Sequence, residues 1–222
     1  MIKKEDLTYD YIHDSDVYVY QRKDMFRVNT DTSLLAKFMK IKAGERVIDI
    51  GTNNGALLLY AARSYPSYLC GIDIQVEACE LAQFNMQQHQ IENYEIICKD
   101  FKLYEGKNFD VALCNPPYFE IDHHRCEKKD MRSIARHEHF LQLEPLLANV
   151  SCVLRSYGRL YLVHRANRIV DLVSLCRKYQ LEIKTMQFVY DQRKECAGAI
   201  LIEAIKNGKV GCTVQNSKII SF

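Results

Sequence analysis

The sequence lacks a long apolar segment. No apolar run in its 222 residues approaches the roughly 20 residues that a helix needs to cross a bilayer. Residues 1–6 lack the apolar stretch of a signal peptide, and no repeat or low-complexity linker interrupts the chain. These absences argue against a membrane partner or secretion, and we expect a cytoplasmic protein.

Cysteine pairs with the spacing of a metal site are also missing. The nine cysteines are odd in number, and none forms a C-x-x-C pair. Cys98, Cys114 and Cys152 lie in apolar runs, where a free thiol acts as a small hydrophobic group. The His- and Cys-containing stretch 123–126 has none of the usual zinc spacings and is crowded by arginine. We expect neither a metal site nor a disulfide framework.

From residue 45 onward, short β-branched runs alternate with longer amphipathic stretches. This alternation predicts an α/β domain with a mostly parallel sheet and helices on both faces. Seven strands are predicted at 46–50, 68–73, 94–98, 109–114, 159–164, 182–190 and 197–205, the last two as an antiparallel C-terminal pair. The predicted helices are 56–64, 75–89, 141–154 and 169–179.

The first forty residues do not follow this pattern. The stretch from Tyr9 to Tyr20 is rich in tyrosine and compatible with a hairpin. Asp31 can provide the N-cap of a helix that runs through Met39. We therefore divide the chain into an N-terminal extension at 1–40, a lid packed on the core, and the α/β domain at 41–222.

An amide, two prolines and an aromatic ring follow the predicted strand 109–114 as Asn115-Pro116-Pro117-Tyr118. The side-chain oxygen of Asn115 and the carbonyl of Pro116 can both accept hydrogen bonds from one exocyclic amine. The prolines restrict the backbone, which keeps both acceptors in place. Tyr118 can stack on the face of a base. The four residues therefore predict a catalytic slot for a planar group that carries an NH2.

A strand, a tight turn and a helix are predicted around Gly51 and Gly55. Glycine allows positive φ and a close approach of a ligand to the backbone. Asp73 ends the next strand, where a carboxylate can accept both hydroxyls of a ribose. The turn, this acid and the Asn115 slot converge at the carboxyl edge of one sheet. Together they predict a cofactor beside the slot.

Two cofactors fit such a turn. NAD would need a full G-x-G-x-x-G pattern, which this sequence lacks. S-adenosylmethionine carries no phosphate, so the shorter and more polar turn is sufficient, and we expect this cofactor. Asp49 could alternatively cap the turn, and Asp100 could alternatively cap a helix. The predicted cofactor-binding residues are Asp49, Gly51, Asn53, Gly55, Asp73, Ile74, Asp100, Phe101 and Asn115.

Positive charge gathers after the slot, although the net charge is only +2. Residues 123–168 contain nine Lys or Arg against four Asp or Glu, with five His besides. A basic surface beside a catalytic pocket favours a polyanionic substrate; the alternative is a solvated helix face. The predicted substrate-binding residues are Phe119, Arg125, Lys128, Lys129, Arg132, Arg136 and His137.

Three stretches carry a family resemblance: Gln21-x4-Phe26-x4-Asp31-x-x-Leu34-Leu35-Ala36, Asp49-Ile50-Gly51 with Gly55, and Asn115 to Phe119 followed by Arg136-His137-Glu138. From about Asp16 to Val214 the chain resembles the bacterial tRNA1(Val) (adenine(37)-N6)-methyltransferases. This resemblance implies a Rossmann-like class I fold, S-adenosylmethionine as cofactor and methylation of adenosine N6 at position 37 of tRNA. Asn53 stands where many relatives carry glycine, and we expect weakened or shifted cofactor contacts there.

Other functions share parts of this pattern. The same slot serves methyltransferases that act on rRNA, on DNA adenine and on protein glutamine. The chain lacks the helical N-terminal domain of the glutamine enzymes, and its length leaves little room for a DNA-recognition region. A catalytically silent RNA-binding module is a further alternative, but the intact Asn115, Pro116, Tyr118 and Asp73 argue against it. We expect a monomeric enzyme that binds tRNA.

Overall fold

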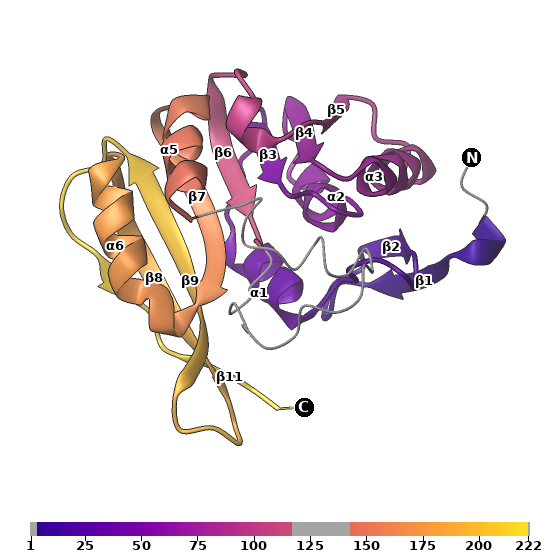
Figure 1. Ribbon diagram of the computed structural model, residues 1–222. Helices are drawn as coiled ribbons and strands as arrows, with labels where there is room; N and C mark the ends of the chain where they lie inside the picture. The colour runs from indigo at the N-terminus through magenta and orange to yellow at the C-terminus, as the bar shows by residue number, and fades with distance from the viewer. Residues whose placement is uncertain (1–3, 117–142, 222) are drawn as a thin grey trace, which may run out of the picture.

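The computed structural model describes residues 4–116 and 143–221, in which one large sheet forms the centre of the molecule (Figure 1). Its long strands are β3 (Arg46–Ile50), β4 (Tyr68–Asp73), β5 (Tyr94–Cys98), β6 (Phe109–Cys114), β7 (Leu154–Arg165), β8 (Leu181–Asp191) and β9 (Ala197–Lys206). Two short strands, β10 (Thr213–Val214) and β11 (Lys218–Ile220), both pair with β8. The strand order is β10-β8-β9-β7-β6-β3-β4-β5.

The strand directions confirm the predicted α/β class. Strands β3, β4, β5, β6 and β7 run parallel to one another, whereas β9 is antiparallel to both β7 and β8. The seven predicted strands are all present, and β8 and β9 form the expected C-terminal antiparallel pair. Strands β10 and β11 were not predicted, because two or three residues are too few to show a period of two.

Helices cover both faces of the sheet (Figure 1). They are α1 (Thr30–Phe38), α2 (Ala56–Ala62), α3 (Val76–Gln88), α5 (Leu143–Val153) and α6 (Ile169–Lys178). Alternate residues of a strand face opposite sides, so Ile48 and Ile50 pack in the core with α5 and α6. Val47 packs in the other core, with α1 and α2. Short 3-10 turns occupy Lys4–Asp6, Phe101–Leu103 and Ala166–Arg168.

The first turn of α1 differs from the prediction. Asn29, not Asp31, is the N-cap, and its Oδ1 accepts a hydrogen bond from the Thr32 backbone N–H at 2.9 Å. A cap at Asp31 would place the first helical residue at Thr32, whereas the helix begins two residues earlier, at Thr30. An N-cap must precede the helix so that its side chain can reach the free N–H groups of the first turn. Asp31 instead lies within that turn.

Strands β1 (Thr8–Tyr11) and β2 (Tyr18–Gln21) form a separate antiparallel hairpin. Its register pairs Tyr9 with Tyr20 and Tyr11 with Tyr18, so four tyrosines share one face. On the opposite face the β2 residues are buried: Val19 is 0% and Gln21 is 2% exposed. Around β2, the Asn85 side chain of α3 accepts from Tyr20 N at 2.8 Å and donates to Tyr20 O at 2.9 Å. The hairpin is thereby attached to the α3 side of the domain.

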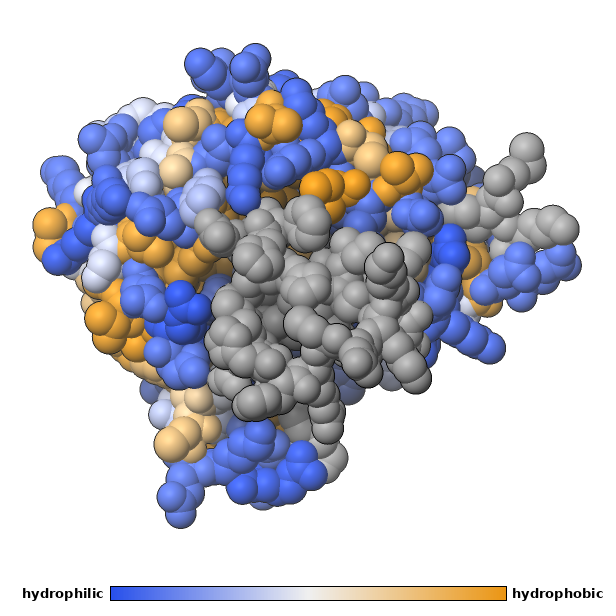
Figure 2. All heavy atoms as spheres, viewed as in Figure 1, coloured by the Kyte–Doolittle hydropathy of each residue, from blue (hydrophilic) through white to orange (hydrophobic). Residues whose placement is uncertain are grey.

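The described surface is largely hydrophilic on the face seen in Figure 2. Within residues 4–116 and 143–221, no helix is long and apolar enough to cross a membrane. Across the same residues, no three His, Cys, Asp or Glu side chains are grouped so that they could hold a metal ion. The eight cysteines described there are free thiols.

Candidate cofactor and acceptor site

The turn between β3 and α2 is tightly folded and fixed to β4. Gly51, Asn53 and Gly55 have φ values of 71°, 49° and 77°, all in the left-handed region. The backbone N–H groups of Gly51 and Thr52 both donate to the Ile72 carbonyl, at 2.8 and 3.0 Å. We refer to residues 51–55 as the cofactor turn.

Asp49 lies beneath the cofactor turn and is 1% exposed. Its Oδ2 accepts a hydrogen bond from Thr52 Oγ1 at 2.9 Å, whereas its Oδ1 is buried and has no hydrogen-bond partner among the described residues. Burial, reinforced by the nearby charge of Asp73, raises the pKa of this carboxyl to about 7. A buried acceptor without a partner is costly. A ligand with a positive charge and N–H donors would satisfy it, and the amino acid part of S-adenosylmethionine has both.

Asp73 at the end of β4 is held by two backbone amides. Its Oδ2 accepts from Asn53 N at 2.9 Å, and its Oδ1 accepts from Gln75 N at 3.0 Å. The side chain is 8% exposed, and burial raises its pKa. These bonds fix the orientation of the carboxylate, and each oxygen keeps a second lone pair. Ile74, the next residue, is 40% exposed.

The residues predicted near the adenine have contacts within the fold. Asp100 caps the short turn after β5, because its Oδ1 accepts from Lys102 N at 2.9 Å. Phe101 is 4% exposed and packs in the core, with its ring 6.3 Å from that of Tyr104. Leu103 of the same turn is 64% exposed. Leu103 therefore adds an exposed apolar side chain at this end of the sheet, and no motif in the sequence pointed to it.

Asn115 follows β6 directly beside the cofactor turn. Strands β3 and β6 are parallel, and the register pairs Ile50 with Cys114, so Gly51 and Asn115 leave the sheet at the same level. The Asn115 Nδ2 donates to Thr32 Oγ1 at 3.0 Å, and that hydroxyl donates to Asn29 Oδ1 at 3.0 Å. The amide is half-buried, and Pro116 is buried. Thr32 therefore fixes which way the Asn115 amide faces.

Several predicted residues lie outside the described part of the chain. They are Pro117 and Tyr118 of the slot and all the predicted substrate-binding residues, namely Phe119, Arg125, Lys128, Lys129, Arg132, Arg136 and His137.

In the described part of the basic stretch, residues 143–168, the arginines do not share one surface. Arg159 of β7 is level with Val111 of β6 and makes two hydrogen bonds of 2.6 and 2.5 Å with the carboxylate of Glu45. Arg155 pairs with Asp110 at the start of β6. Arg165 and Arg168 lie at the other end of β7. Asn115 follows the carboxyl end of β6, whereas Arg155 and Arg159 lie beside Asp110 and Val111 near its amino end, so these two arginines lie toward the opposite edge of the sheet.

Replacing Arg159 by alanine should therefore affect stability rather than RNA binding. Its side chain is 13% and that of Glu45 14% exposed, and removing one partner of a largely buried pair leaves the other charge uncompensated. We expect the free energy of unfolding to fall by about 1–3 kcal/mol, the cost of leaving a buried polar group without its hydrogen-bond partner, with an unchanged salt dependence of RNA binding. Denaturant unfolding measures the first and RNA titrations at several salt concentrations the second. Arg63→Ala, which removes a pair with Asp16 in which the two side chains are 47% and 74% exposed, is the control and should change stability little.

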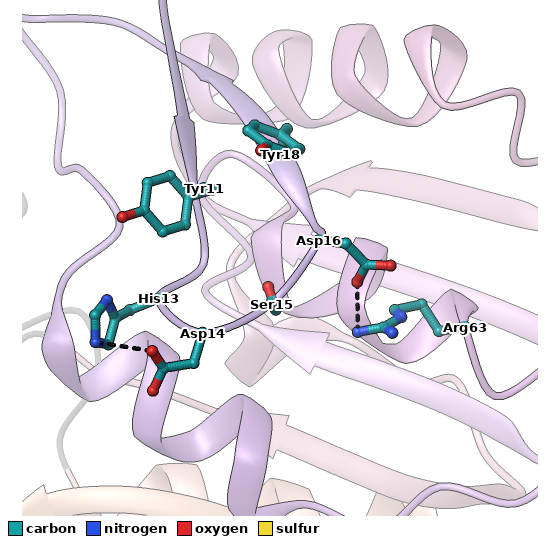
Figure 3. A pocket seen from close by; sticks show the side chains of 7 residues that line it. All are labelled: Tyr11, His13, Asp14, Ser15, Asp16, Tyr18 and Arg63. Atoms are coloured by element: carbon teal, nitrogen blue, oxygen red, sulfur yellow. Dashed lines mark ion pairs between the residues drawn. The ribbon is translucent and has the colours of Figure 1, made fainter.

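A shallow hollow opens at the turn of the hairpin, away from these residues (Figure 3). There Arg63 pairs with Asp16 at 2.9 Å. The hollow is lined by Tyr11, His13, Asp14, Ser15, Asp16, Tyr18 and Arg63, none of which is a predicted site residue. Asp49, Asp73 and Asn115 lie together at the carboxyl edge of the sheet, which we take as the candidate site.

The strand order and the cofactor turn after β3 define a Rossmann-like methyltransferase fold. A predicted O-methyltransferase from Agrobacterium tumefaciens has this fold, with a TM-score of 0.65, 18% identity and coverage of 86% of this chain and 87% of that one. The family model described as a methyltransferase domain matches residues 41–209.

Sequence relatives narrow this class. A Bacteroides fragilis (strain YCH46) protein named tRNA1(Val) (adenine(37)-N6)-methyltransferase is 32% identical over 63% of this chain and 60% of its own length, less than two thirds. A Parabacteroides distasonis protein of the same name is 30% identical over 73% of this chain and 70% of its own length. The chain belongs to the methyltransferase-domain family and, within it, to the family of these tRNA1(Val) (adenine(37)-N6)-methyltransferases.

Proposed function

We propose that this protein transfers the methyl group of S-adenosylmethionine to the exocyclic N6 amine of an adenosine in tRNA, at position 37 of tRNA1(Val). The relatives named for that reaction support the substrate. The observation that carries the chemistry is the position of Asn115, which leaves the sheet level with Gly51 of the cofactor turn and whose amide is oriented by Thr32. An acceptor amine held at Asn115 would therefore lie beside the cofactor.

The cofactor-binding roles follow from the charges at the turn. When bound, S-adenosylmethionine supplies a methyl group activated by a positively charged sulfur. Asp49 would accept a hydrogen bond from the amino group of its methionine part, at the carboxylate oxygen that has no partner among the residues described. Asp73, fixed by the Asn53 and Gln75 amides, would accept the ribose hydroxyls. Gly51 and Gly55 let the backbone approach the ligand closely.

The acceptor amine needs alignment more than it needs a base. The lone pair of adenine N6 is delocalised into the ring, so this nitrogen is a weak nucleophile. Asn115 Oδ1 and the Pro116 carbonyl would accept its two hydrogens and point the lone pair at the methyl group. The same two oxygens stabilise positive charge as it develops on the nitrogen, and alignment supplies most of the remaining acceleration. The proton leaves after methyl transfer.

The tRNA would present its target base out of the stack. Bases that undergo chemistry at a ring substituent must first leave their neighbours, and aromatic side chains then receive them. We assign this role to Tyr118 and Phe119, and contacts with the phosphates to Arg125, Lys128, Lys129, Arg132, Arg136 and His137. We infer a cytoplasmic, monomeric enzyme from a substrate of this kind.

The test is methyl transfer from radiolabelled S-adenosylmethionine to bulk tRNA from a strain deleted for the gene, followed by nucleoside analysis. Labelled N6-methyladenosine in tRNA is the expected product. Label in rRNA or in a protein instead would retain the methyl transfer and overturn the tRNA substrate. Absence of label from all three, together with no cofactor binding by calorimetry, would favour a catalytically silent RNA-binding module.

A further inference from the structure

The segment between β2 and α1 lies against the cofactor turn, and we refer to residues 25–29 as the strap. Met25 is 8% exposed and packs with Ala78 and Leu81 of α3. The carbonyl of the next residue, Phe26, accepts a hydrogen bond from Asn53 Nδ2 at 2.6 Å. The strap is thus held to the domain by an apolar anchor and by a side chain of the turn itself.

A second bridge runs through Gln21 at the end of β2. Its Oε1 accepts from Val28 N of the strap at 2.5 Å and from Asn54 Nδ2 of the cofactor turn at 3.1 Å. Gln21 is 2% exposed, so both bonds are shielded from water. Two consecutive residues of the turn, Asn53 and Asn54, therefore contact the strap directly or through one side chain.

The other end of the strap reaches the acceptor amide. Asn29, its last residue, caps α1 and accepts hydrogen bonds from both the N–H and the hydroxyl of Thr32. The same hydroxyl accepts from Asn115 Nδ2 at 3.0 Å. Only Arg27 and Val28 lie between Phe26, whose carbonyl is held by the cofactor turn, and Asn29, whose side chain holds Thr32. The strap consequently joins the two halves of the site by a short path.

Asn53 is the residue whose side chain makes this link. Its backbone N–H donates to Asp73, and its φ of 49° is one that glycine adopts without strain and asparagine tolerates. A glycine at this position would keep the turn and the bond to Asp73 but could not reach Phe26. The side chain therefore adds an attachment that the turn itself does not require.

We propose that Asn53 is a positioning residue that fastens the strap to the cofactor turn, so that the turn and the Asn115 slot are held in one fixed arrangement. This role rests on the methyl transfer proposed above. The attachment of the strap can nevertheless be tested without RNA, by binding of the cofactor product S-adenosylhomocysteine and by amide hydrogen exchange. A fixed strap preorganises the turn, and preorganisation strengthens binding by reducing the ordering that a ligand must impose. Release of the strap should weaken cofactor binding and loosen Asn115 together.

The first experiment compares Asn53→Gly with Asn207→Gly. Asn207 is a matched control, because it has a φ of 56° and its Nδ2 donates one hydrogen bond, to Ser156 Oγ at 3.0 Å, far along the chain from the site. We expect Asn53→Gly to raise the dissociation constant of S-adenosylhomocysteine about 3- to 10-fold and to speed amide exchange at residues 25–29. The control should change neither. Equal behaviour of the two variants would overturn the proposal.

Asn53→Gly has two effects: it removes the Nδ2 donor and it adds backbone freedom. Asn53→Asp removes only the donor and so distinguishes the two. Aspartate has the same shape and tolerates the same φ, but it cannot donate to the Phe26 carbonyl. It should speed exchange in the strap as Asn53→Gly does. Slow exchange in the Asp variant would attribute the glycine effect to the backbone and contradict a role for the side-chain bond.

A double-mutant cycle tests the connection to the acceptor slot. Thr32→Val keeps the shape but removes the hydroxyl that Asn115 and Asn29 share. If the strap joins the cofactor turn to the Asn115 slot, the double variant should lose less kcat/KM for tRNA than the product of the fold-losses of Asn53→Gly and Thr32→Val. Fully multiplicative losses would show two independent sites. A wild-type protein that binds the cofactor but methylates no tRNA would overturn the proposed substrate, while the exchange comparison would still decide the role of Asn53.

Discussion

Asn115→Ala is expected to lower kcat for tRNA methylation by at least about 100-fold while the dissociation constant of S-adenosylmethionine changes only a few-fold. The variant lacks the oxygen that would hold the acceptor amine and stabilise its developing charge, and loss of one such preorganised group costs about 10²–10³ in kcat. The cofactor contacts assigned to Asp49, Asp73 and the cofactor turn remain.

Single-turnover methyl transfer and calorimetry measure the two quantities separately. Asn207→Ala, at a distant exposed position, is the control for loss of an asparagine and should leave both unchanged. Thr32→Val should give a smaller loss of kcat, because the Asn115 oxygen is retained but its orientation is no longer fixed. If Asn115→Ala lowered cofactor affinity as strongly as turnover, this would contradict the assignment of acceptor binding to the slot and of cofactor binding to the turn.

Asp49→Asn is expected to have opposite effects on cofactor binding and on stability. The buried carboxylate would bind the amino group of the cofactor by a charge-assisted hydrogen bond. Such bonds contribute about 1.5–3 kcal/mol, so the dissociation constant should rise about 10- to 100-fold. Without ligand, however, the same buried carboxylate is a cost to the folded state when it is ionised.

The pH dependence follows from the raised pKa. Burial moves the pKa of Asp49 from 3.8 to about 7 in the folded protein. Between these values the folded state binds more protons than the unfolded state, so stability from this group is present below its unfolded pKa and is lost as the pH rises through 7. Asp49→Asn has no carboxyl group to titrate at this position, so its stability does not fall with pH in this way. It should therefore be more stable than the wild type at pH 8, and the difference in stability should become smaller toward pH 5.

Thermal unfolding of the ligand-free proteins from pH 5 to 8 measures this crossover, with Asp16→Asn, at a 74% exposed side chain, as the control. Wild-type affinity for the cofactor should increase over the same range, because the positively charged ligand favours the ionised carboxylate, and the Asn variant should bind with little pH dependence. Equal stability of wild type and Asp49→Asn at pH 8 would mean that the carboxylate is already neutralised by a group within the protein.

The sheet could be predicted from sequence because its strands are local patterns. Each run from Arg46–Ile50 to Ala197–Lys206 is rich in residues that suit a buried strand and is bounded by polar or turn residues. The cofactor turn was equally local: its glycines and Asp49 lie within seven residues. The strand bounds differ most at β7, which begins at Leu154, five residues before its predicted start.

The missed features depend on contacts between distant residues. Thr32 and Asn115 are 83 positions apart, and no local pattern pairs a helix hydroxyl with that amide. For the described residues 143–168 of the basic stretch, proximity in sequence did not predict a shared surface. Arg159 is level with Val111, toward the amino edge of the sheet, and pairs with Glu45 there, whereas Arg165 ends β7 at the carboxyl edge.

The two short strands after β9 affect whether copies of the folded protein can associate through the edge of the sheet. An open strand edge presents unpaired N–H and C=O groups, a template on which other chains can add and aggregate. Strand β8 would be such an edge over 11 residues, but β10 pairs with it at Thr185 and Met186, and β11 at Val189 to Asp191. Between them, Asn216 accepts from the Gln187 side chain at 3.0 Å. The opposite edge is β5, only five residues long. Strands β10 and β11 thus protect this edge of the sheet from edge-to-edge association between copies of the chain.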